Sequence, residues 1–254
     1  MRTTTKLAPL ALALALPLSF TASGVAFAAN GNATANLSPV PLNESQASGT
    51  ANVTVSGNRL DVTVDVSNIL ADNPHAAHIH FGMDALHECP TAAADEDGSG
   101  HINTTEGGPA YGPVTVSLTT KGDTSPDSTL AVDRFDTAPG GTINYARGHI
   151  KVSSAVAKGI LASEAVIVVH GNDYNGNGKY DGAEKSDLDK SLPTEATDPN
   201  VCGVLNASPT GGAAAGIGGG STGTSPELLG LGAALGLAAV GSGAVAYRRR
   251  RSES

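Results

Sequence analysis

The chain has 254 residues, of which 40% are hydrophobic and 4% aromatic, and its formal net charge is −9. Residues 30–206 alone carry 9 Lys and Arg against 22 Asp and Glu, a net charge of −13. A surface this acidic does not attract nucleic acid or anionic lipid by bulk electrostatics, so we expect no nucleic-acid partner.

Residues 1–29 have the layout of an export signal. Arg2 and Lys6 precede an apolar run at residues 7–18, and Ala26-Phe27-Ala28 fits the small-x-small pattern of a signal-peptidase site. The apolar run is short for a membrane span. We therefore expect cleavage after Ala28 or Ala29 and an exported mature protein.

Residues 30–206 have the length of one folded domain, and their alternation predicts strands. Apolar residues alternate in 51–56 and again in 60–66, on either side of the turn Ser56-Gly57-Asn58, which indicates a β-hairpin. Further strands are expected at residues 77–81, 113–119, 129–135, 142–152 and 165–170, with one short helix at 156–163. This spacing favours an all-β sandwich or barrel of antiparallel strands.

The segment Pro74-His75-Ala76-Ala77-His78-Ile79-His80 contains two histidines at strand spacing. On a strand, His78 and His80 lie on one face about 7 Å apart, which suits a shared copper or zinc ion. Paired histidines serve as often as hydrogen-bonding groups, so both interpretations stay open. We interpret His75 as a group that supports the pair, and His87 and His149 as exposed or hydrogen-bonded.

Two segments, 95–106 and 173–184, match the twelve-residue EF-hand calcium loop. Each has oxygen-bearing side chains at positions 1, 3, 5 and 9, glycine at 6, an apolar residue at 8 and glutamate at 12. Ca²⁺ prefers six to eight oxygen ligands, glycine allows the sharp bend, and the final glutamate can supply two oxygens. No long amphipathic helices flank the loops, so we expect two calcium ions that stiffen the loops, with solvated acidic turns as the alternative.

The expected calcium ligands are Asp95, Asp97, Ser99, His101, Asn103 and Glu106 in the first loop, and Asp173, Asn175, Asn177, Lys179, Asp181 and Glu184 in the second. His101 and Lys179 stand at position 7, which contributes a backbone carbonyl only.

Cys89 and Cys202 are the two cysteines of the chain. Outside the cytoplasm, one disulfide between them is the natural expectation, and two free thiols are the alternative. The bridge would close a loop of over 100 residues and stabilise the fold by about 4–5 kcal/mol in the chain-entropy model.

The end of the chain has the layout of an anchor. Residues 207–227 are expected to form a flexible Gly/Ala/Ser tether, and the uncharged residues 228–247 a membrane-spanning helix of about 30 Å. Arg248 to Arg251 open the basic tail, 248–254, which the positive-inside rule places in the cytoplasm. We expect a cell-surface protein anchored in the cytoplasmic membrane. The layout also resembles wall proteins of Gram-positive bacteria, but the LPxTG motif is missing, so wall attachment is the alternative.

Four segments resemble the Cu/Zn superoxide dismutase fold and, more loosely, the CHRD domain. Residues 43–66 resemble the first hairpin of the dismutases, 75–82 their copper strand H-G-F-H-V-H-x-x-G, 168–173 their V-V-H strand, and 201–205 their terminal A-C-G-V-I. The resemblance covers residues 35–206 and implies a Greek-key fold of about eight strands. It also implies copper on His78, His80 and His170, and a disulfide between Cys89 and Cys202.

The chain also departs from the dismutase pattern. His101 stands where the family has its copper–zinc bridging histidine, yet it is also position 7 of the first calcium loop, so both roles stay open. Glu106 stands where a zinc ligand is expected, so we expect no zinc. Pro199 replaces the arginine that guides superoxide, and the second calcium loop occupies the place of the electrostatic loop.

Three functions follow from these features. The first is a surface-anchored metal-binding β module stabilised by calcium and one disulfide, which the missing arginine and zinc ligands favour. The second is a copper-only extracellular superoxide dismutase, and the third is extracellular copper buffering. We assign no catalytic residue. Metal ions and the membrane are the expected partners, and no motif points to a particular protein or glycan.

Overall fold

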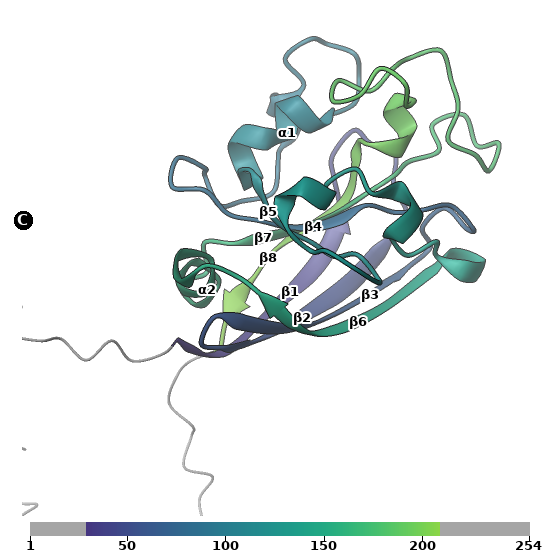
Figure 1. Cartoon of the computed structure of the whole chain (residues 1–254). Helices are drawn as coiled ribbons and strands as arrows, with labels where there is room; N and C mark the ends of the chain where they lie inside the picture. The colour runs from purple at the N-terminus through teal and green to yellow at the C-terminus, as the bar shows by residue number, and fades with distance from the viewer. Residues whose placement is uncertain (1–28, 209–254) are drawn as a thin grey trace, which may run out of the picture. The chain divides into compact units, whose positions relative to one another are not determined.

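The computed structural model describes residues 29–208 (Figure 1). The predictions of an export signal, a tether, a membrane span and a basic tail fall almost entirely outside this part of the chain. Among the described residues, no helix is long and apolar enough to cross a membrane.

One antiparallel sheet curls into a half-barrel and forms the body of the domain (Figure 1). Its strands lie in the order β5-β4-β7-β8-β1-β2-β3-β6, and the short β9 pairs with β1. The strands are β1 (Asn30–Pro39), β2 (Ser48–Ser56), β3 (Arg59–Ser67), β4 (Ala77–His80), β5 (Val114–Ser117), β6 (Thr142–Lys151), β7 (Val166–His170), β8 (Pro199–Val204) and β9 (Asn206–Ala207). The all-β antiparallel prediction is confirmed, as one curled sheet.

Short helices and 3-10 turns occupy the connections. They are α1 (Thr104–Tyr111), α2 (Ser154–Leu161), η1 (Ala92–Ala94), η2 (Pro126–Ser128), η3 (Val132–Arg134), η4 (Pro139–Gly141) and η5 (Thr194–Ala196). The predicted helix at residues 156–163 is confirmed as α2, slightly earlier in the chain. The Ser153 side chain caps it by accepting the backbone N–H of Val156 at 3.2 Å.

Helix α1 was not predicted, because Gly107, Gly108 and Pro109 all disfavour helix. A capping box starts it: the Asn103 side chain accepts the N–H of Glu106, and the Glu106 carboxylate accepts the N–H of Asn103, both at 3.0 Å. The spacing of Asn103 and Glu106 therefore indicates the start of a helix, although both residues also belong to the predicted calcium loop.

The strand predicted at residues 129–135 is wrong, since this segment forms η3 and irregular chain. Local side-chain hydrogen bonds stabilise this irregular segment. The Asp123 carboxylate accepts the Ser128 hydroxyl at 2.6 Å, and Arg134 donates to the Ser128 hydroxyl at 2.9 Å and to the Asp123 carbonyl at 3.0 Å. Such side-chain bonds compete with the ladder of a sheet.

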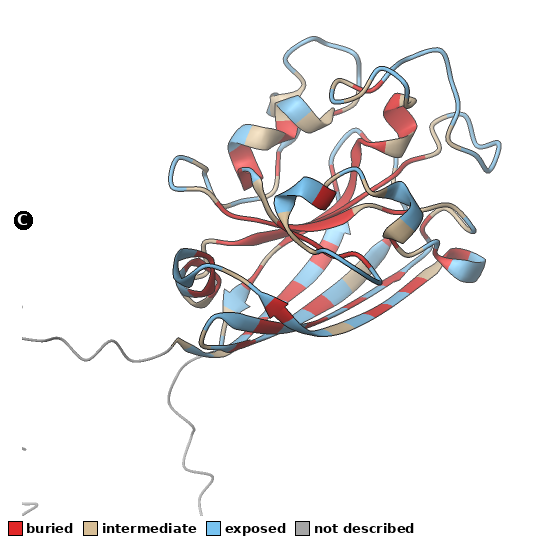
Figure 2. Cartoon of the chain, viewed as in Figure 1, coloured by how far each residue is buried: buried red, intermediate tan, exposed pale blue. Residues whose placement is uncertain are grey.

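The two halves of the sheet are buried differently (Figure 2). Strands β2 and β3 alternate between buried and exposed residues, because one face packs on the core and the other meets solvent. By contrast, all residues of β4 and β7 are buried. On the second face, Val166 and Val168 of β7 pack with Ile102 and Tyr111 of the connections, and the His80 ring of β4 contacts the Tyr111 ring. The β4–β7 part of the sheet is thus covered on both sides.

The disulfide between Cys89 and Cys202 is present, with a Cα–Cα distance of 5.8 Å across 113 residues of sequence. It joins the connection after β4 to strand β8 and confirms the expected pairing. Cys202 is buried and packs with Val40 and Val168, so the bridge also fastens the covering connection to the sheet.

Candidate metal centre

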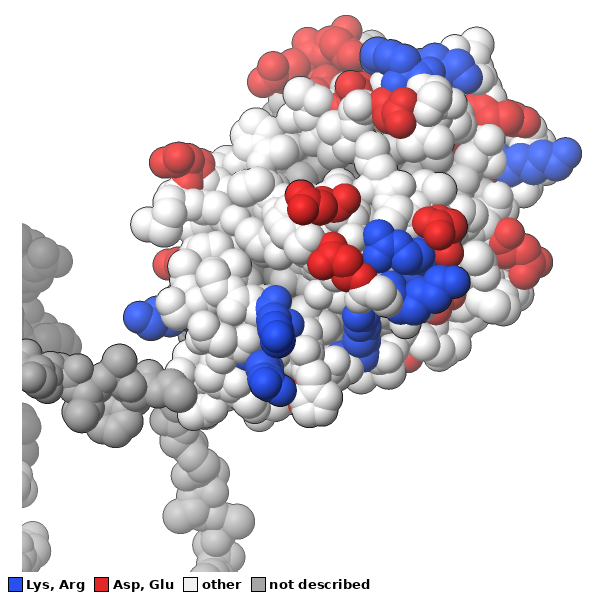
Figure 3. All heavy atoms as spheres, viewed as in Figure 1, with Lys and Arg blue, Asp and Glu red and all other residues white. Residues whose placement is uncertain are grey.

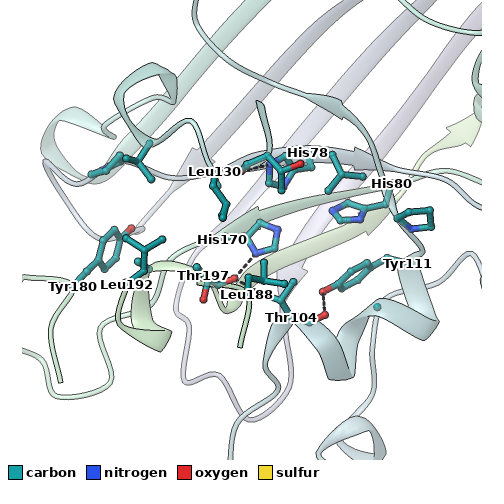
Figure 4. A pocket seen from close by; sticks show the side chains of 18 of the residues that line it. His78, His80, Thr104, Tyr111, Leu130, His170, Tyr180, Leu188, Leu192 and Thr197 are labelled. Carbon is teal, nitrogen blue, oxygen red and sulfur yellow. Dashed lines mark hydrogen bonds between the residues drawn. The ribbon is translucent and has the colours of Figure 1, made fainter. Parts of the chain in front are cut away.

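Three histidines converge on the covered face of the sheet (Figure 4). His78 and His80 alternate along β4, as the sequence predicts, and His170 ends the neighbouring strand β7. Because Ala77 pairs with Val169, the next residue His170 lies opposite Ala76, and its N–H donates to the Ala76 carbonyl at 2.8 Å. This register puts His170 on the same face as His78 and His80. Their ring centroids lie 5.2–6.2 Å apart.

Irregularities in the ladder fall on two of these residues. The register shifts between Ile79 and His80 in the β4–β5 pair, and between Val169 and His170 in the β7–β8 pair. Bulges of this kind bend a strand and re-aim its side chains, and they are common beside functional sites.

Each of the three rings is oriented by a backbone carbonyl. His78 Nε2–H donates to the Thr129 carbonyl at 3.1 Å, His80 Nδ1–H to Gly112 at 2.8 Å, and His170 Nδ1–H to Thr197 at 2.7 Å. A carbonyl can only accept, so each bond requires the proton on that nitrogen. The other nitrogen of each ring carries a lone pair.

The three lone-pair nitrogens are His78 Nδ1, His80 Nε2 and His170 Nε2. All three are buried without a hydrogen-bond partner. One ring nitrogen from each of the three histidines lies within 4.8 Å of one from each of the others. Burial lowers the pKa of His80 to about 3 and that of His170 to about 4, and it lowers the pKa of His78 well below the ordinary value. The rings are therefore neutral at pH 7, the form that binds a metal ion.

Two buried rings support this cluster. Both ring nitrogens of His75 lie 2.8 Å from carbonyl oxygens, Nδ1 from that of His170 and Nε2 from that of Leu70. The Tyr111 ring lies with its centroid 4.5 Å from that of His80. His75 thus contacts the backbone of a cluster member, as its place beside the pair suggested. His87 is half-buried and hydrogen-bonded to the Gly82 carbonyl, and His149 is exposed.

A pocket of about 380 Å³ opens above the three rings (Figure 4). Its walls are mainly apolar, and no Asp, Glu, Lys or Arg is among the residues that line it. The larger wall residues are Tyr111, Leu130, Val132, Tyr180, Leu188 and Leu192.

In the first predicted calcium loop, three carboxylates converge. One oxygen each of Asp95, Asp97 and Glu106 lies within 4.8 Å of the others, which brings loop positions 1, 3 and 12 together. The Asp95 carboxylate also accepts the N–H groups of Ser99 and Gly100, both at 3.1 Å, and so shapes the turn. In Figure 3 the largest group of acidic side chains on the visible face lies over this loop.

The second loop repeats the turn of the first but not its carboxylate group. The Asp173 carboxylate accepts the N–H groups of Asn177 at 3.1 Å and Gly178 at 2.8 Å, at the same loop positions. The side-chain amides of Asn175 and Asn177 both donate to Asp181 at 2.8 Å. Within residues 29–208, Asp173, Asp181 and Glu184 do not form a three-carboxylate cluster.

The family model of the CHRD domain matches residues 27–178. The chain belongs to the CHRD domain family. The matched region contains all three clustered histidines and the whole first loop, and it ends inside the second loop. No curated protein matches the sequence.

A buried glutamate that the sequence did not single out closes the second loop of this CHRD domain. Glu195 accepts the N–H of Tyr174 at 3.0 Å and that of Asp181 at 2.7 Å, which are loop positions 2 and 9. In the first loop, the Glu106 carboxylate accepts the N–H groups of the same two positions, that of Glu96 at 2.9 Å and that of Asn103 at 3.0 Å. Glu195 lies eleven residues beyond position 12, so no motif of contiguous residues could have found it.

His101 stands apart from the histidine cluster of the CHRD domain. Its Nε2 lies 3.5 Å from a carboxylate oxygen of Asp198 and 3.6 Å from one of Glu184. Burial raises the pKa of Asp198 to about 7. Among the described residues, the three-histidine group does not include His101. The His101 ring lies instead beside the carboxylates of Glu184 and Asp198.

Proposed function

We propose that this CHRD domain is a surface-anchored metal-binding module that holds one copper ion on His78, His80 and His170. The observation that carries the proposal is that three clustered histidines each have a buried imidazole nitrogen without a hydrogen-bond partner. A buried acceptor left without a donor costs about 1–3 kcal/mol, and a shared cation would satisfy all three at once.

The donor set fits copper. Imidazole nitrogen suits copper and zinc, and copper(II) is bound most strongly in the usual order of divalent ions. The carbonyl that accepts from each ring fixes its tautomer and orientation, as is usual for metal-binding histidines. The same three residues match the copper positions of the dismutase resemblance. A bound copper ion would supply one-electron redox chemistry.

The surroundings favour metal binding over superoxide turnover. No cationic residue lines the pocket above the histidines, and residues 30–206 carry a net charge of −13. The electrostatic field of this negative charge repels the superoxide anion. The arginine expected from the dismutases is replaced by Pro199. Copper holding at the cell surface is therefore the function we propose.

Calcium is the second part of the proposal. Two EF-hand-like loops with the same internal turn support it, and the three convergent carboxylates of the first loop are oxygen ligands of the kind that Ca²⁺ prefers. Bound calcium and the Cys89–Cys202 disulfide would together stiffen the connections that cover the histidines. The export signal and anchor expected from the sequence support a location at the cell surface.

The test is elemental analysis of the full-length protein, loaded with Cu²⁺ in the presence of Ca²⁺ and then desalted. We expect about one copper per chain. The double variant His78→Ala/His80→Ala should lose it, whereas His149→Gln, at an exposed histidine, should keep it. Unchanged copper content in the double variant would refute the site.

A further inference from the structure

The pocket above the histidines has the size and chemistry of a small-molecule site. Its volume of about 380 Å³ lies in the range of roughly 300–1,000 Å³ that is common for ligand pockets. Its walls come from separate parts of the chain: α1 supplies Tyr111, the segment around η3 supplies Leu130 and Val132, and the connection before β8 supplies Leu188 and Leu192.

Exposed apolar side chains concentrate at this pocket. Six large hydrophobic residues of the described chain are clearly exposed, and three of them, Leu130 (38%), Val132 (43%) and Leu188 (47%), line it. Isolated exposed apolar residues need no explanation, but a group of them around one cavity is typical of a binding site.

The polar groups of the pocket wall are already engaged. The Thr104 hydroxyl donates to the Thr197 carbonyl, and the Thr129 hydroxyl donates to the Pro126 carbonyl. The Thr197 hydroxyl donates to the Ser186 hydroxyl, and the Tyr111 hydroxyl donates to the Thr104 carbonyl. Among the buried side-chain nitrogen and oxygen atoms of the lining residues, those without a hydrogen-bond partner are the three histidine nitrogens at the floor. In the copper-free protein, a charged ligand would therefore lose its hydration without gaining a counter-charge.

We propose that the pocket binds a neutral, largely apolar small molecule directly above the three histidines. An aromatic or aliphatic body would fill the apolar walls, and any polar atom of the ligand would lie toward the histidine floor. The position of the ligand next to a metal ion rests on the proposed copper site, whereas the preference for a neutral apolar body rests on the walls alone.

A matched pair of fluorescent probes tests the preference. N-phenyl-1-naphthylamine is neutral, and 1-anilinonaphthalene-8-sulfonate is the same skeleton with a negative charge. We expect the full-length, copper-free, calcium-replete protein to bind the neutral probe saturably at one site, at least ten-fold more tightly than the sulfonate. Equal affinity for the two probes, or no saturable binding of the neutral one, would overturn the proposal.

Variants locate the binding. Leu130→Asp and Leu188→Asp put a charge on the pocket rim and should each weaken binding of the neutral probe at least ten-fold. Leu86→Asp changes an exposed leucine (66%) that does not line the pocket, so it should leave binding unchanged. Equal weakening by all three variants would show that the probe binds elsewhere, and would overturn the proposal.

Copper separates this inference from the proposed function. Cu²⁺ quenches nearby fluorophores, so loading the protein with copper should quench the bound neutral probe. Binding of the probe by a protein that takes up no copper would refute the copper site and leave the ligand preference standing. Copper uptake without quenching would refute the position above the histidines.

Discussion

Glu195 occupies in the second loop the place that Glu106 occupies in the first. Each carboxylate accepts the backbone N–H groups of loop positions 2 and 9. Glu106 belongs to its loop as the twelfth residue, whereas Glu195 reaches the second loop from η5. The two loops are therefore closed by equivalent side chains that come from different places in the sequence.

Glu106→Gln should remove most of the calcium stabilisation of the first loop. Glutamine preserves the capping box of α1 but lacks the charge and the second carboxylate oxygen. Calcium at ten times its Kd stabilises a site by about 1.4 kcal/mol, so we expect a loss of roughly 1 kcal/mol, or about 2–4 °C in Tm. Thermal unfolding in calcium and in EGTA measures it. An equal loss in both media would contradict the calcium interpretation of this loop.

Glu195→Gln and Glu184→Gln distinguish the two candidates for the last ligand of the second loop. Glu195 is buried, and its carboxylate faces into the loop, whereas the Glu184 side chain is 59% exposed and lies beside His101. We expect the difference in Tm between calcium and EGTA to shrink in Glu195→Gln and to stay at the wild-type value in Glu184→Gln. The reverse pattern would restore Glu184 as the ligand that the sequence motif predicts.

The histidine cluster should make the copper-free protein acid-sensitive. Burial lowers the pKa values of His80 and His170 to about 3 and about 4. Between about pH 6.5 and pH 4 the unfolded chain therefore binds a proton at each histidine that the folded chain does not. The free energy of unfolding must then fall as the pH falls, by at most about 1.4 kcal/mol per pH unit for each histidine, and this part is fully present above pH 6.5.

Urea unfolding of the copper-free protein at pH 7, 6 and 5 measures this slope. His80→Gln should reduce it by up to about 1.4 kcal/mol per pH unit, and His149→Gln, at an exposed position, should not change it. If the slope of His80→Gln equals that of the wild type, His80 is already charged in the folded protein.

Loss of the disulfide should destabilise the domain strongly. The bridge spans 113 residues, for which the chain-entropy model predicts at most about 4–5 kcal/mol, and measured losses are commonly about 2–5 kcal/mol. We expect Cys89→Ser to lower Tm by roughly 5–15 °C. The matched measurement is the wild type in a reducing agent, which should unfold at a similar temperature. A change below 2 °C in both would show that the covering connection is held by packing alone.

The sequence predicts the regular half of the fold better than the site-bearing half. Hairpin β2–β3 follows from alternation, because one face of these strands meets solvent. Alternation also places His78 and His80 on one face, but His170 joins them only through the pairing of β4 with β7, and the resemblance alone pointed to it. Glu195 was not foreseen for the same reason, since tertiary contact brings it to the loop.

Helix α1 links the two kinds of metal chemistry proposed for this domain. Its first turn is capped by Glu106, the residue that closes the first predicted calcium loop, and its C-cap is Gly112, whose carbonyl orients His80. About two turns of helix thus connect the carboxylate that closes the first loop to the carbonyl that orients His80. With the proposed ions bound, calcium at Glu106 and copper at His80 would each restrain one end of this helix.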